Sequence, residues 1–150
     1  MKIKIKKLPH FDESLGLPKY ETSGAAGADI RACLGAGDKI VIPAGARTLI
    51  PTGLALEIQA GYEVQIRPRS GLSLKTGLLV VNSPGTIDSD YRGELKIILG
   101  NLSPKDEVIT HGDRIAQMVI APVIQAEFEA VDELSSTERG SGGFGSTGRR

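Results

Sequence analysis

LALEIQAGYEVQIR, residues 54–67, holds two short runs of aliphatic and β-branched residues on either side of a glycine-containing turn. In the second run, YEVQIR, apolar and polar side chains alternate, which is typical of a β-strand with one buried face. Glycine between two such runs is a turn signal. The stretch therefore predicts two neighbouring strands.

The same pattern recurs along most of the chain. Further runs of this kind are KIKIK (2–6), KIVI (39–42), LLVV (78–81), ELKIIL (94–99) and IAQMVIAPV (115–123). Turn formers separate them: LGAGD, PAGA, PTG, SPG, SPKD and HGD. Short strands at this spacing predict an all-β sandwich, jelly roll or barrel and exclude a doubly wound α/β fold. Helical periodicity is confined to SGLSLKTG (70–77), which predicts one short helix with Ser70 as N-cap and Gly77 as its stop.

Length and charge restrict the class of protein. A chain of 150 residues fits a single domain. Eighteen basic and eighteen acidic residues give a formal net charge of zero, so no global field draws the chain to nucleic acid or to an anionic membrane. Cys33 is the one cysteine, which we interpret as a small buried hydrophobe in a reducing compartment. No apolar run is long enough to span a bilayer, so we expect a soluble, cytoplasmic protein.

The pattern weakens after Gln125, where EFEAVDELSSTERG leads into RGSGGFGSTGRR. We therefore expect a β core over residues 1–125 and an arm over residues 126–150. Glycine-rich tails are commonly disordered and solvated, which leaves Phe144 unexplained. The alternative is that the tail closes onto a flat group, with its free N–H groups around phosphate.

Three internal segments carry candidate polar residues. Arg67 and Arg69 directly precede the predicted helix, where they form either a phosphate site or solvated strand-end charges. GTIDSDYRG (85–93) places Asp88, Asp90 and Tyr91 on one loop. The two acids could be turn formers, whereas the aromatic ring favours a pocket for a sugar or base.

Two weaker segments add to these. Asp29 follows small residues in AAGADIRA (25–32), a β-like run whose backbone can approach a neighbour closely. Gln117 lies among apolar residues in GDRIAQMVI and needs a partner for its amide, which a backbone group could supply. His111, in the HGD turn, is interpreted as a surface residue, as is His10.

The order of these segments is more informative than any one of them. AGADI, RPRSGLSLKTGL, GTIDSDYRGE, GDRIAQMVIAPV and RGSGGFGSTG resemble the five ordered motifs of the trimeric deoxyuridine triphosphatase (dUTPase) family, over roughly residues 22–148. The resemblance implies a distorted jelly-roll or β-clip sandwich and a homotrimer whose active sites are each drawn from three subunits. It also implies hydrolysis of dUTP to dUMP and pyrophosphate with Mg²⁺, which keeps uracil out of DNA.

The resemblance also implies roles for individual residues. Asp88 is the expected general base, and Tyr91 is expected to pack against the deoxyribose. Asn82 and Thr86 are expected to bind uracil. Asp29 is expected to meet the magnesium ion at most through water. The residues expected to hold phosphate or to close over the nucleotide are Arg69, Ser70, Gly71, Gln117, Arg139, Phe144, Gly145, Ser146 and Thr147.

Two other functions compete with this one. The related dCTP deaminases share the fold but carry a glutamate on the strand after the third motif, where this chain has Ile98, so a deaminase would lack its base. A catalytically silent nucleotide-binding trimer is the other alternative. The presence of Asp88 argues against it.

Overall fold

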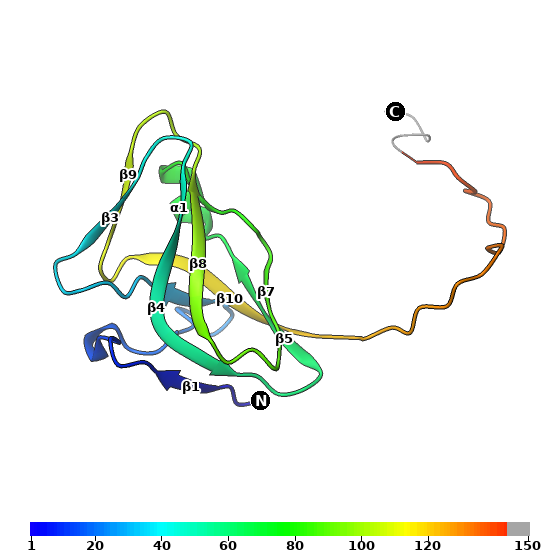
Figure 1. Cartoon of the computed structure of the whole chain (residues 1–150), viewed down its shortest axis with the longest axis horizontal. Helices are drawn as coiled ribbons and strands as arrows, with labels where there is room; N and C mark the ends of the chain where they lie inside the picture. The colour runs from blue at the N-terminus through cyan, green and yellow to red at the C-terminus, as the bar shows by residue number, and fades with distance from the viewer. Residues whose placement is uncertain (144–150) are drawn as a thin grey trace.

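The computed structural model describes residues 1–143 and is built from antiparallel β-sheet (Figure 1). One four-stranded sheet has the order β1-β4-β8-β6, a second has the order β2-β10-β5-β7, and β3 pairs with β9 in a two-stranded ribbon. The strands are β1 (Lys4–Lys7), β2 (Ala28–Arg31), β3 (Lys39–Ile42), β4 (Arg47–Glu57), β5 (Tyr62–Arg67), β6 (Leu78–Val80), β7 (Gly85–Ile87), β8 (Glu94–Asn101), β9 (Glu107–Thr110) and β10 (Arg114–Pro122). The all-β prediction is confirmed.

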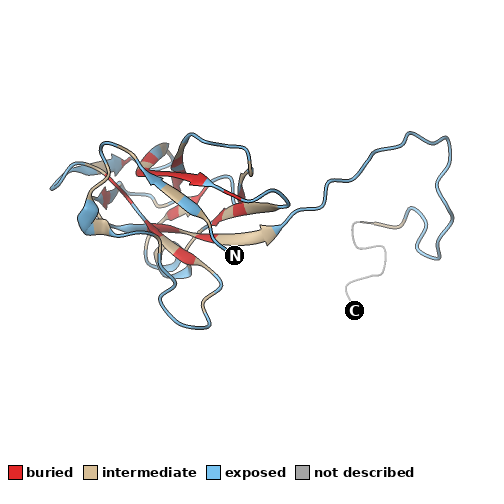
Figure 2. Ribbon diagram, turned by 90° about the horizontal axis from the view of Figure 1, so that it is seen from below, coloured by how far each residue is buried: buried red, intermediate tan, exposed pale blue. Residues whose placement is uncertain are grey.

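Buried residues of both larger sheets form one hydrophobic core, and Figure 2 marks the buried residues in red. In β5, Val64 and Ile66 are buried while the residues between and beside them are more exposed, so the alternation in YEVQIR does place one face inward. Leu95, Ile97 and Leu99 do the same for β8. Each such side chain contributes about 1.5–3 kcal/mol on burial. This packing fixes the sheet on which the candidate site is built.

The predicted turn at PTG (51–53) is wrong, because β4 runs through it. Its pairing with β8 shifts between Pro51 and Ala55, and Gly53 adopts a φ of 68°. Proline cannot donate a ladder hydrogen bond, and a glycine at positive φ is typical of such an irregularity. The Gly53 N–H donates instead to the Glu94 side chain, at 2.9 Å. The strand therefore bends without ending.

Other boundaries differ from the sequence prediction. Strands β7 and β9 were not predicted, since each is short and contains or adjoins turn residues. The helix α1 (Ser70–Lys75) is confirmed, but Ser70 is its first helical residue, and Arg69 occupies the N-cap position without a side-chain cap. A short 3₁₀ helix, η1 (Glu13–Leu15), was also not predicted.

Cys33 is buried, as predicted, at 1% exposure. The surface interpretation of His111 is wrong, since its side chain is 11% exposed. Its Nδ1 accepts from the Leu34 N–H at 3.1 Å and its Nε2 lies 3.0 Å from Asp12 Oδ2, so Nε2 carries the proton. The ring thereby ties the turn after β9 to the N-terminal segment and to the chain after β2.

The C-terminal segment leaves the body after β10. The Val123 N–H donates to Gly61 O at 2.9 Å, and from Ile124 onward the chain extends away from the sheets (Figure 1). Ile124 and Phe128 are more than nine-tenths exposed, at 94% and 95%. The helices in the described part of the chain are too short to cross a membrane.

Candidate active site

Four of the residues expected at the site face one hollow of about 490 Å³ beside β7 and β8. Asn82 comes from the loop between β6 and β7, Thr86 from β7, and Asp88 and Tyr91 from the loop between β7 and β8. The other lining residues are Leu49, Ile87, Glu94, Lys96 and Ile98. The structure therefore brings a carboxylate, an amide, a hydroxyl and an aromatic ring to one concave surface.

Asp88 lies between this hollow and a second one of about 530 Å³, which is lined in part by Tyr62, Ser89 and Gln125. Within residues 1–143 its carboxylate has no hydrogen-bond or ion-pair partner, although its backbone oxygen accepts from the Tyr91 N–H at 3.2 Å. Because the oxygens are exposed and unpaired, they can accept a proton from a bound water molecule.

In the described part of the chain the Asp88 and Asp90 side chains accept no hydrogen bond, so the turn-former alternative does not account for them. Arg92 Nη1 donates to Ser89 O at 2.7 Å and to Tyr91 O at 2.9 Å, which holds the loop from its other side. The Tyr91 hydroxyl donates to Glu94 O at 3.1 Å, and the residue is 45% exposed. Asp88 is thus presented on a turn that is held by Arg92 and by the Tyr91 hydroxyl.

Glu94 was missed by sequence reasoning, where its place directly after the glycine of the loop is the one available signal. Its Oε1 accepts from the Gly53 N–H and lies near His10 Nε2, both at 2.9 Å, and Lys96 Nζ is 3.5 Å from Oε2. Burial alone would raise the pKa of this carboxyl, but the hydrogen bonds from Gly53 and His10 and the charge of Lys96 outweigh it and lower the pKa. Glu94 therefore anchors the edge of the hollow as a carboxylate.

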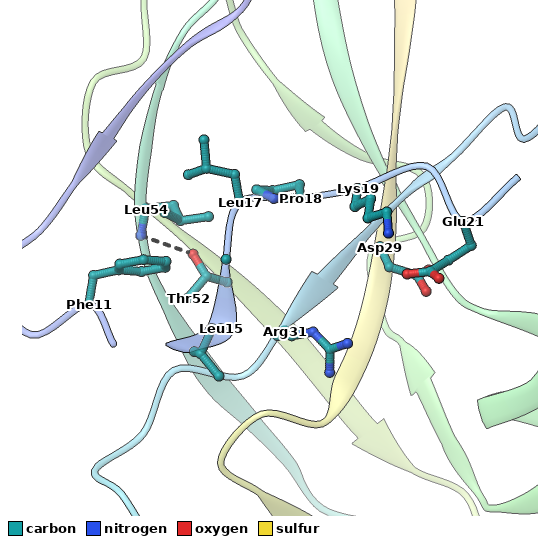
Figure 3. A pocket seen from close by; sticks show the side chains of 11 residues that line it. Phe11, Leu15, Leu17, Pro18, Lys19, Glu21, Asp29, Arg31, Thr52 and Leu54 are labelled. Carbon is teal, nitrogen blue, oxygen red and sulfur yellow. Dashed lines mark hydrogen bonds between the residues drawn. The ribbon is translucent and has the colours of Figure 1, made fainter. Parts of the chain in front are cut away.

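A second polar cluster lies where α1, β2 and β10 meet. Asp29 accepts from Arg69 Nε at 2.8 Å and from Arg114 Nη1 at 3.1 Å, and its carboxylate is 12% exposed. Ser70 and Gly71 follow Arg69 in the first turn of α1 and are exposed. The alternative in which Arg69 is a free strand-end charge does not hold, because its guanidinium is paired. Figure 3 shows Asp29 beside Glu21 and Lys19 at a hollow of about 280 Å³.

Gln117 joins this cluster through a backbone contact, which confirms that a backbone group is the partner of its amide. Its Nε2 donates to Pro68 O at 2.9 Å. A Cβ on Gly27 would lie 2.1 Å from Gln117 Oε1, so the glycine leaves the space that the amide occupies. The close approach expected at AAGADIRA is therefore made by the Gln117 side chain.

The two clusters lie apart in one chain. Ile87, next to Asp88, pairs with Val64 near the start of β5, while Arg69 follows Arg67 at its end. The five residue steps from Val64 to Arg69 span about 17 Å where the chain is extended. Asp88 and Arg69 of the same chain therefore do not meet.

Comparison with known proteins assigns the family. The dUTPase family model matches residues 13–148. The chain is 61% identical over 146 residues to a deoxyuridine 5'-triphosphate nucleotidohydrolase of Roseobacter denitrificans, covering 97% of this chain and 95% of the relative. The chain belongs to the dUTPase family. It is also 55% identical over 150 residues to the Hydrogenobaculum enzyme of the same name, covering all of both chains.

Solved dUTPases share the fold. The dUTPase of Staphylococcus bacteriophage 80alpha, crystallised with dUPNHPP, matches with a TM-score of 0.81 at 28% identity and covers 98% of each chain. A mutant dUTPase of phage phi11 of S. aureus, described for its structural Mg(II) ion, matches with a TM-score of 0.75 at 25% identity, covering 91% of this chain and all of that one.

Two further expectations for this dUTPase concern metal and the arm. Within residues 1–143 no group of three or more His, Cys, Asp or Glu side chains is placed to hold a metal. Both oxygens of Asp29 accept from arginines, so they do not fit a direct metal ligand.

Arg139 Nε donates to Gly142 O at 2.8 Å near the end of the extended segment. The other expected arm residues, Phe144, Gly145, Ser146 and Thr147, lie outside the described residues.

Proposed function

We propose that this dUTPase hydrolyses dUTP to dUMP and pyrophosphate, with Asp88 as the general base. The observation that carries the proposal is the Asp88 carboxylate, which has no partner within residues 1–143 and faces one hollow with Asn82, Thr86 and Tyr91. The relatives at 55–61% identity are named for this hydrolysis of a phosphoanhydride. The product dUMP is a precursor of thymidylate, and removal of dUTP limits uracil in DNA.

Asp88 takes the proton of a water molecule as the water oxygen attacks the α-phosphorus in line with the leaving group. The bond from that phosphorus to the bridging oxygen of the β-phosphate breaks, and pyrophosphate leaves. A positioned base contributes typically about 10²–10⁴-fold to such a step. The exposed, unpaired position of Asp88 leaves its oxygens available for this role.

The rest of the hollow suits a deoxyuridine. The amide of Asn82 offers donor and acceptor atoms to the polar edge of uracil, and Thr86 adds a hydroxyl. The face of Tyr91 is a flat apolar surface for the sugar, since its hydroxyl is turned to Glu94 O. A site that hydrogen-bonds its ligand rejects analogues with a mismatched edge far more strongly than one that relies on shape alone.

The second cluster suits the triphosphate. Arg69 and Arg114 are oriented by one carboxylate, Asp29, and Ser70 and Gly71 present exposed polar groups at the start of α1. Charge-assisted bonds from guanidinium groups are the strong contacts of phosphate sites. Gln117 is held next to them by Pro68 O. In this role Asp29 orients the Arg69 and Arg114 side chains.

A complete site then needs more than one subunit, because the Asp88 hollow and the Arg69 cluster of one chain lie at opposite ends of β5. We propose a homotrimer in which one subunit supplies the Asp88 hollow and another the phosphate cluster. The exposed apolar residues Ile124, just before the arm, and Phe128 and Leu134 within it support contact with another subunit, since large exposed apolar groups mark interaction surfaces. The division into a core of residues 1–125 and an arm of residues 126–150 belongs to this proposal.

The arm is proposed to close the site. Arg139 would reach the terminal phosphates, Phe144 would cover the uracil ring, and Gly145, Ser146 and Thr147 would follow the triphosphate. Ordering costs about 1–2 kcal/mol per residue, which base stacking and charge-assisted bonds can offset when nucleotide is bound. Mg²⁺ would arrive on the triphosphate, as Mg²⁺ is commonly held by substrate phosphates and few protein groups.

The test is a substrate panel on the purified enzyme with Mg²⁺. Release of pyrophosphate is measured from dUTP, dCTP, dTTP and UTP, with ammonia release from dCTP as a check for deamination and Asp88→Asn as the inactive control. We expect rapid release from dUTP alone. Equal rates on the four nucleotides, ammonia from dCTP, or full activity of Asp88→Asn would each contradict the proposal.

A further inference from the structure

Gly93 joins the Asp88 loop to β8, and its backbone does not need a glycine. Its φ lies outside the left-handed region that favours this residue. A Cβ built on Gly93 would instead lie 2.3 Å from the Tyr91 hydroxyl oxygen, 2.6 Å from Cζ and 3.0 Å from Cε2. The ring of Tyr91 therefore occupies the space that any larger residue at position 93 would take.

The ring is held in this place from two directions. Its hydroxyl donates to Glu94 O at 3.1 Å, and the loop behind it is fixed by the bonds from Arg92 Nη1 to Ser89 O and Tyr91 O. The hydroxyl end and one edge of the ring lie next to Gly93, and Tyr91 also lines the hollow that contains Asp88 and Asn82. The depth of the hollow at the ring thus depends on how closely the ring can approach the backbone at position 93.

We propose that Gly93 is a specificity-determining position that seats the Tyr91 ring and thereby sets the discrimination between 2'-deoxyribose and ribose. The inference rests on the proposed function, in which the ring meets the sugar of dUTP. A 2'-hydroxyl adds a single oxygen to the sugar, so a ring that excludes it must be positioned to within about 0.5 Å. Gly93 acts through Tyr91 and needs no contact with the substrate.

An added methyl group would disturb this seat. To reach an ordinary separation of about 3.5 Å, the ring must move by roughly 1 Å from the new Cβ. Such a shift breaks or lengthens the bond from the hydroxyl to Glu94 O and changes the space left for the sugar. Displacements of this size in an active site cost up to about 10²-fold in rate.

The experiment compares wild type with Gly93→Ala for hydrolysis of dUTP and UTP. We expect the ratio of kcat/KM for dUTP over UTP to fall by about 10- to 100-fold, because a misplaced group in an active site can cost up to about 10²-fold in rate. Gly24→Ala is the matched control, because a Cβ there meets nothing within 4 Å and the φ of Gly24 is also outside the left-handed region. An unchanged ratio in Gly93→Ala would overturn the inference, whereas a wild type inactive on dUTP would instead overturn the proposed function.

A double-mutant cycle with Tyr91→Ala separates the seat from a general structural role. In the Tyr91→Ala background the ring is absent, so adding Gly93→Ala is expected to change neither the dUTP/UTP ratio nor the thermal unfolding midpoint. If Gly93→Ala alone does not fold, the double variant Tyr91→Ala/Gly93→Ala should fold, because the clash is removed. A double variant that loses folding or selectivity beyond Tyr91→Ala would show that Gly93 serves the backbone, and the inference would be wrong.

Discussion

The two polar clusters of this molecule differ in how their side chains are held. In the cluster around Asp29, a carboxylate pairs with Arg69 and Arg114, and Gln117 is tied to Pro68 O. In the hollow around Asp88, the carboxylate itself has no partner within residues 1–143, and the bonds belong to the loop that presents it. The first cluster is organised before any ligand arrives, whereas the second leaves its base available. Substitutions in the two clusters should therefore separate stability from activity.

Asp88→Asn should have the largest effect on turnover. The amide cannot take the proton of water, so kcat should fall by about 10²–10⁴-fold, while the affinity for dUTP and the free energy of unfolding stay close to those of wild type. Single-turnover kinetics, calorimetric binding and chemical denaturation measure the three quantities. A large change in stability would show that the carboxylate is paired in the assembled enzyme.

Removal of residues 139–150 tests the arm against both clusters. Loss of one stacked ring, at about 1–3 kcal/mol, and one charge-assisted bond, at about 1.5–3 kcal/mol, predicts a fall in kcat/KM of at least about 100-fold. The trimer should persist, because the exposed apolar residues Ile124, Phe128 and Leu134 are retained. Sedimentation equilibrium and steady-state kinetics give the result, and undiminished kcat/KM in the truncated enzyme would refute closure by the arm.

Asp29→Ala should lower stability as well as substrate affinity. It removes the acceptor for two guanidinium groups, at a cost of about 1.5–3 kcal/mol in the free energy of unfolding, and lets Arg69 move, so KM should rise. The control is Asp90→Ala, whose carboxylate has no partner in the described part of the chain and which should change stability by less than about 0.5 kcal/mol. Equal denaturation midpoints for the two variants would contradict the difference between the clusters.

Glu94→Gln should have the smallest effect, visible in the pH dependence of stability. Because folding lowers the pKa of Glu94 below its ordinary value of 4.5, the carboxylate stabilises the native state above that pH, and this contribution is lost as the pH falls through the lowered pKa. The glutamine variant should lose less stability on acidification, by under about 1 kcal/mol. Urea denaturation of both proteins at pH 7 and below pH 4 measures the loss of stability on acidification. An equal loss in wild type and Glu94→Gln would contradict this prediction.

The strands with clear alternation were predictable, and the short ones were not. YEVQIR and KIVI became β5 and β3 with the expected bounds, because one-sided burial imposes its own period on the sequence. Strand β7 has only three residues and begins at a glycine, and β9 lies directly between the turn formers SPKD and HGD. Strand β4 continues through Pro51 and Gly53, where Glu94 accepts the Gly53 N–H. Local turn propensity was overruled there by a contact between distant residues.

The sequence by itself determined the all-β class and the order of the motifs that mark the family, since both depend on residue types and their spacing along the chain. Tertiary structure alone decided that Asp29 serves two arginines, that His111 is held between Asp12 and Leu34, and that Gly27 and Gly93 make room for Gln117 and Tyr91. Apart from Tyr91 and Gly93, which share one loop, these contacts join residues far apart in the chain and depend on how strands and turns pack. No local pattern records such a contact, because its energy depends on distances that exist only after folding.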